Sequence, residues 1–93
     1  MRGSLKTVRR RALERVRAQY EYAAGMSELS LQSVNRVRPP SMQYRSINEL
    51  VREWLAAAGA VCTFAVNIGV ITPQEALQII RDFQAAHPDM VDE

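Results

Sequence analysis

Residues 46–86 read SINELVREWLAAAGAVCTFAVNIGVITPQEALQIIRDFQAA, a pattern that predicts two helices joined by a short turn. The run from Ser46 to Glu49 has the spacing of a capping box, in which the Ser46 hydroxyl accepts from the Glu49 amide and the Glu49 carboxylate reaches back. The apolar residues that follow recur at three- and four-residue spacing, which is typical of one helix face. This face comprises Ile47, Leu50, Val51, Trp54, Leu55, Ala58, Cys62, Ala65 and Ile68.

The turn between the two helices carries its own stop and start signals. Gly69 can adopt the left-handed conformation that ends many helices. Thr72 and Glu75 have the spacing of a second capping box, and Pro73 stands at the first helical position, where its missing N–H costs nothing. We therefore expect an antiparallel hairpin of one long and one short helix. The apolar face of the short helix is expected at Ala76, Leu77, Ile80 and Phe83, up to the stop at His87-Pro88.

Residues 5–24 predict a basic amphipathic helix that Gly25 closes. Its apolar stripe comprises Leu5, Val8, Ala12, Val16, Tyr20 and Ala23, with Leu13 on the edge. Arginines flank the stripe on both sides, a layout typical of an interface helix whose partner is protein, lipid headgroups or phosphate. Arg9 falls inside the stripe, so it must snorkel or meet an acid. The candidate partner-binding or polyanion-binding residues are Arg9, Arg10, Arg11, Arg15 and Arg17.

The segment between these parts, residues 25–45, is ambiguous. Ser27 can cap a short helix that turns Leu31, Val34 and Val37 inward and stops at Pro39-Pro40. An alternating strand is the competing interpretation, but a lone strand has no pairing partner elsewhere in the chain. We expect the short helix, followed by a plain linker.

The 93 residues are enough for one small domain, which we divide into 5–24, 25–45, the hairpin 46–86 and an acidic tail 87–93. Charge is distributed unevenly along it. Ten of the twelve basic residues lie within residues 1–45, whereas seven of the ten acids lie within 46–93. Such a chain folds its basic half over its acidic half, pairs with a copy of itself, or offers the basic half to a polyanion.

Small residues in the long helix predict close approach by another helix. Pairs four residues apart leave room for a neighbouring backbone, and the other segments carry little apolar area to surround this helix. We therefore expect self-association, with the helix-packing or oligomer interface at Trp54, Ala56, Gly59, Ala60 and Thr63.

The hairpin has two competing interpretations. Residues 54–71 hold no charge over eighteen positions, which is long enough for a membrane span. Many of these residues are alanine or glycine, and charged residues precede them on the same expected helix, so a buried helix is favoured. A DNA-binding helix-turn-helix fits the first helix and the glycine turn. It fails in the second helix, where Glu75 and Gln78 stand at positions that need apolar residues.

Signatures of catalysis, metal binding and cofactor binding are missing. The glycines are scattered singly, and one cysteine with one histidine cannot close a zinc site. Cys62 lies in an apolar stretch and is expected to be an inert buried thiol, while His87 is expected to interact with a helix C-terminus. The lone cysteine is compatible with a reducing, cytoplasmic location.

These observations predict an all-α protein that is not an enzyme and needs no cofactor. We expect a small helical binding or adaptor protein that acts through protein–protein contacts, as an oligomer or as a subunit of a larger assembly. The alternative is a small nucleic-acid-binding regulator that uses the basic N-terminal helix. A third possibility is a membrane-associated subunit with a span near 54–71.

Overall fold

The computed structural model describes residues 4–91, and within this range the regular structure is entirely helical. The all-α prediction is therefore confirmed. In chain order the elements are α1 (Leu5–Ala24), α2 (Glu28–Arg36), the 3₁₀ turn η1 (Pro40–Met42), α3 (Ile47–Asn67), α4 (Pro73–Ala86) and the single-turn α5 (Pro88–Val91).

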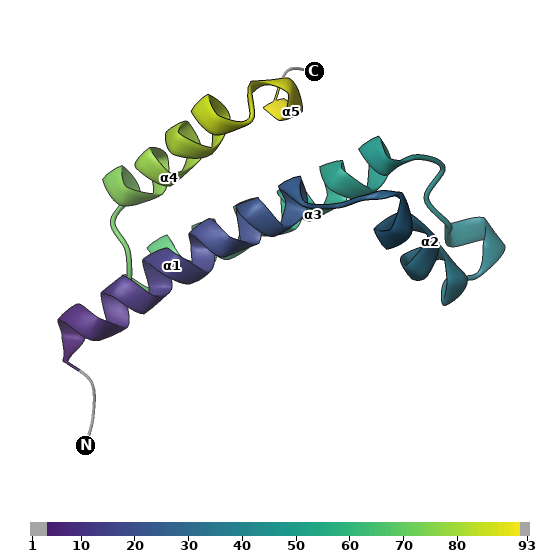
Figure 1. Ribbon diagram of the computed structural model, residues 1–93. Helices are drawn as coiled ribbons and strands as arrows, with labels where there is room; N and C mark the ends of the chain where they lie inside the picture. The colour runs from purple at the N-terminus through teal and green to yellow at the C-terminus, as the bar shows by residue number, and fades with distance from the viewer. Residues whose placement is uncertain (1–3, 92–93) are drawn as a thin grey trace.

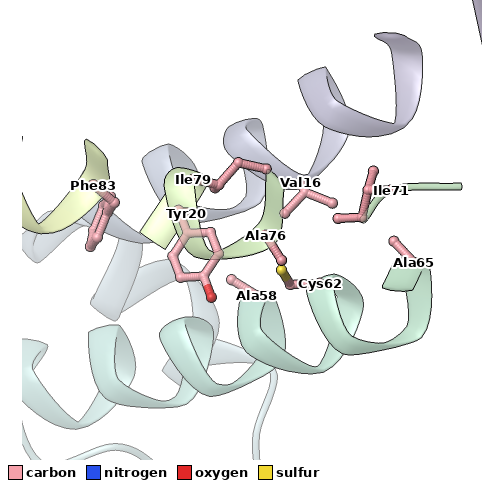
Figure 2. Packing of buried hydrophobic residues seen from close by; sticks show 9 residues of the cluster. All are labelled: Val16, Tyr20, Ala58, Cys62, Ala65, Ile71, Ala76, Ile79 and Phe83. Atoms are coloured by element: carbon pink, nitrogen blue, oxygen red, sulfur yellow. The ribbon is translucent and has the colours of Figure 1, made fainter. Parts of the chain in front are cut away.

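The two long helices α1 and α3 lie side by side in opposite directions, and α4 packs on them after the turn that follows α3 (Figure 1). The short helix α2 lies near the N-terminal end of α3. Side chains from α1, α3, α4 and the α3–α4 turn meet in one core cluster (Figure 2). The cluster comprises Val16, Tyr20, Ala58, Cys62, Ala65, Ile71, Ala76, Ile79 and Phe83.

Helix ends follow the expected local chemistry. Gly69 has φ +81°, as predicted for the left-handed residue after α3. At α4 the capping box is complete: the Glu75 amide donates to Thr72 Oγ1 at 3.0 Å, and the Thr72 amide donates to Glu75 Oε1 at 2.8 Å. Because both bonds join residues three apart, the sequence alone was enough to predict them.

The cap of α3 differs from the expectation in one bond. The Glu49 amide donates to Ser46 Oγ at 3.3 Å, as predicted. The Glu49 carboxylate, however, accepts from the Arg45 amide at 2.6 Å, one residue before the cap. The side chain of Glu49 therefore joins the first turn of α3 to the residue that precedes the cap.

The predicted short helix α2 is present, with Ser27 as its cap. Leu31 and Val34 are half-buried as expected, but Val37 is wrong as an inward residue, because it is the C-cap and 83% exposed. The loop after it is held by Asn35, whose side-chain amide donates to the Tyr44 carbonyl at 3.0 Å and accepts from the Tyr44 amide at 2.9 Å. These two bonds join the end of α2 to the residues just before α3 and so fix the course of the loop between them.

Four other expected core positions are corrected. Leu77 is 46% exposed, and Ile79 takes the buried place on α4. Ile68 is exposed after the end of α3, and Ile71 in the turn fills the core there. Leu5 and Val8 are also exposed, because α3 ends at Asn67 and no longer covers the first turn of the antiparallel α1.

Candidate functional site

Two of the five candidate arginines of α1 are bound to acids of α4. The Arg9 guanidinium donates to both carboxylate oxygens of Glu75 at 2.8 Å, and Arg17 donates to Asp82 at 2.9 Å. Glu21 lies 3.1 Å from the His87 ring at the end of the same helix. The partners are always 65 or 66 residues apart, so α1 and α4 run parallel in a fixed register.

These contacts lower the pKa of both α4 carboxyl groups. For Glu75 the largest cause is the hydrogen bond from the Thr72 amide, and Arg9 adds to it. For Asp82 it is the hydrogen bond from the Gln78 amide, followed by the bond from Arg17. Since both pairs are partly exposed to solvent, each is a modest stabilising contact that fixes the register of the helices.

Three candidate arginines remain outside this arrangement. Arg10 lies 4.0 Å from Glu14 on its own helix, a loose and exposed contact. Arg11 and Arg15 are exposed and have no ion-pair partner among residues 4–91. They are one helical turn apart and, at 100° per residue, lie on the flank of α1 opposite Arg17.

A second apolar row runs along α3, outside the core. The row begins at Ala57 and ends at Ile68, and its four residues are spaced four, three and four positions apart. They therefore share one flank of the helix. Phe64 is 62% exposed, Ile68 55% and Val61 38%. The row comprises Ala57, Val61, Phe64 and Ile68.

The arginine pair and this apolar row lie on the same side of the molecule. Tyr22 of α1 and Trp54 of α3 meet edge to face, with ring centroids 5.1 Å apart, which sets the antiparallel register of the two helices. In this register Arg11 and Arg15 lie alongside the part of α3 that carries the row, on the side away from α4. We call this surface the outer face and define it as Arg11, Arg15, Ala57, Val61, Phe64 and Ile68.

The opposite flank of α3 borders an apolar groove of about 370 Å³ against α4. Gly59 and Thr63, two of the predicted packing residues, line it together with Leu77. The groove exists because these α3 residues are small. Its other lining residues are Tyr20, Cys62, Val66, Pro73, Ala76 and Ile80, so none of the lining side chains is charged.

The other three predicted packing residues of α3 do not line this groove. Trp54 is half-buried and packs on Tyr22, which is itself 58% exposed. Ala56 lines a polar pocket beside η1, and Ala60 is exposed. Ala56, Gly59, Ala60 and Thr63 are spaced three and four residues apart and share one flank of α3, whereas Trp54 lies on another flank.

Neither potentially reactive side chain lies in a catalytic arrangement. Burial raises the pKa of the Cys62 thiol, and Figure 2 shows its sulfur pointing toward Ala76. His87 stacks near Phe83 at a centroid distance of 4.8 Å, close to the predicted helix C-terminus. In the part of the chain that the structure describes, no group of three or more His, Cys, Asp and Glu residues is placed to hold a metal ion.

Sequence reasoning overlooked the exposed row of α3. Val61 and Phe64 stood in the sequence at helical spacing with Ile68, so a second stripe could have been recognised. It was hidden because almost every residue of α3 is apolar, and only the packing shows which of its flanks stays uncovered.

No family model matches the chain, and no curated protein or solved structure is significantly similar to it. On the third possibility, a span over 54–71, no helix within residues 4–91 is long and apolar enough to cross a membrane.

Proposed function

We propose that this protein is a small, non-enzymatic helical binding module that takes a partner protein on its outer face. The observation that carries the proposal is the exposed row of Val61, Phe64 and Ile68 beside Arg11 and Arg15, which have no acid partner among residues 4–91. Exposed apolar side chains next to arginine are typical of protein interfaces, where aromatic residues and arginine are enriched.

The alternative, a nucleic-acid-binding regulator, draws on the same arginines. Two of its five candidates, Arg9 and Arg17, are engaged with Glu75 and Asp82. Arg10, Arg11 and Arg15 are left along α1 for a phosphate backbone, but an apolar row adjoins Arg11 and Arg15. This layout favours a protein partner.

The test compares partner recovery by matched variants. Wild-type protein and the double variant Phe64→Glu, Ile68→Glu are immobilised and exposed to a nuclease-treated extract of the native cells. We expect a defined set of proteins on the wild type and its loss from the variant, because two buried carboxylates in an apolar interface are strongly unfavourable.

A matched control places the same change on another part of the surface. Leu29 and Val37 are exposed apolar residues at α2, so Leu29→Glu, Val37→Glu should retain the bound proteins. Melting curves must show that both double variants remain folded. Equal recovery by all three proteins contradicts the proposal, as does recovery from an untreated extract that is absent after nuclease treatment.

A further inference from the structure

We infer that the occupant of the outer face is an acidic amphipathic helix from a different protein, an inference that rests on the proposed function. The face consists of two neighbouring rows, cationic on α1 and apolar on α3. A single helix can match both rows at once, with apolar residues facing α3 and acids on the flank that faces α1.

The dimensions of the face define this helix further. Ala57 and Ile68 are eleven residues apart, or about 16 Å along α3, which corresponds to about three turns of a partner helix. Arg11 and Arg15 are separated by one turn, so the matching acids on the partner are expected three or four residues apart.

Two copies of this chain do not fit together by their outer faces. Two outer faces brought together would oppose four arginines, and none of the six residues that define the face is an acid to neutralise them. Glu75 and Asp82, the acids of α4, already bind Arg9 and Arg17 within the chain. Charge complementarity therefore favours a different, acidic protein.

The experiment uses three synthetic peptides of about 18 residues, a length at which a helix can form in solution. All three carry the same apolar stripe, and one flank holds glutamate, glutamine or lysine. None contains tryptophan, so Trp54, the only tryptophan of the protein and close to the outer face, reports binding by fluorescence. Calorimetry gives the dissociation constants.

We expect the glutamate peptide to bind about tenfold more tightly than the glutamine peptide, as two exposed ion pairs allow. The lysine peptide should bind more weakly than both. In the variant Arg11→Glu, Arg15→Glu the order should reverse, with the lysine peptide now preferred.

Arg36→Glu, Arg81→Glu is the matched control, since it changes net charge equally at exposed arginines on α2 and α4. It should retain the wild-type order. Retained order in Arg11→Glu, Arg15→Glu overturns the inference, as does stronger binding to anionic vesicles or duplex DNA than to the glutamate peptide.

Failure of the inference can be told apart from failure of the proposed function. If all three peptides bind equally and lose binding in Phe64→Glu, Ile68→Glu, the outer face is a protein-binding face without acidic preference, and only the inference fails. If no peptide binds and the extract experiment also shows no face-dependent partner, both fail.

Discussion

At the scale of single residues, two glycines have opposite roles. Gly59 lies inside α3, where an added Cβ would come no closer than 3.8 Å to the Tyr20 hydroxyl. Gly69 holds φ +81°, with no atom within 4 Å of an added Cβ. The same substitution by alanine should therefore change the free energy of unfolding in opposite directions.

Gly59→Ala should stabilise the protein by about 0.5–1 kcal/mol, because alanine restricts the unfolded chain and has the higher helix propensity. Gly69→Ala should destabilise it by about 1 kcal/mol, because a side chain disfavours positive φ. Urea unfolding of both variants checks this pair. A loss of stability in Gly59→Ala would show that the backbones pack more tightly there than the distances indicate.

The Thr72 cap can be tested at the same scale. Thr72→Ala removes the acceptor of the Glu75 amide and should cost about 1 kcal/mol. Thr72→Ser, which keeps a hydroxyl, should recover most of that loss in the same unfolding measurement. Equal losses in the two variants would contradict a capping role.

At the scale of elements, the contact between α1 and α4 should depend on pH. The pKa values of Glu75 and Asp82 are lowered from 4.5 and 3.8 in the folded protein. The two carboxylates therefore contribute their full stabilisation at pH values above the ordinary pKa values of the unfolded chain. This stabilisation is lost as the pH falls through the lower pKa values of the folded protein.

The measurement is the melting temperature of the wild type and of Glu75→Gln, Asp82→Asn between pH 7 and pH 2. The double variant should be less stable at pH 7 and should lose less stability on acidification. Glu28→Gln, at an exposed acid on α2, should follow the wild-type curve. Parallel curves for all three proteins would show that the α1–α4 pairs contribute nothing to the pH dependence.

At the scale of the whole molecule, the exposed apolar area favours self-association. The α3–α4 groove has no charged lining residue, so two copies can meet there without the repulsion expected at the outer face. We expect a dimer or higher species at micromolar concentration by sedimentation. Leu77→Glu should weaken it, whereas Phe64→Glu should leave it unchanged. A monomer mass together with cooperative unfolding would contradict self-association.

The sequence by itself determined the four longer helices of this protein, whereas η1 and α5 lie where a linker and a tail were expected. The start of α2 at Ser27, the turn at Gly69 and the capping box at Thr72 depend on contacts between residues a few positions apart. Periodicity also located most of the core, because a helix face repeats every three or four residues. The capping-box rule predicted the wrong partner for the Glu49 carboxylate, which accepts from the Arg45 amide instead of the Ser46 amide.

Only the tertiary structure decided which residues remain available to a partner. Arg9 and Arg17 bind acids of α4, whereas Arg11 and Arg15 have no ion-pair partner in the described part of the chain. This difference follows from the register of α1 on α4, which joins residues 65 or 66 positions apart. The exposure of Phe64 and the burial of Ile79 follow in the same way from how the helices pack. The physical reason is that helix formation is local, whereas the choice of which flank is covered depends on contacts between segments far apart in the chain.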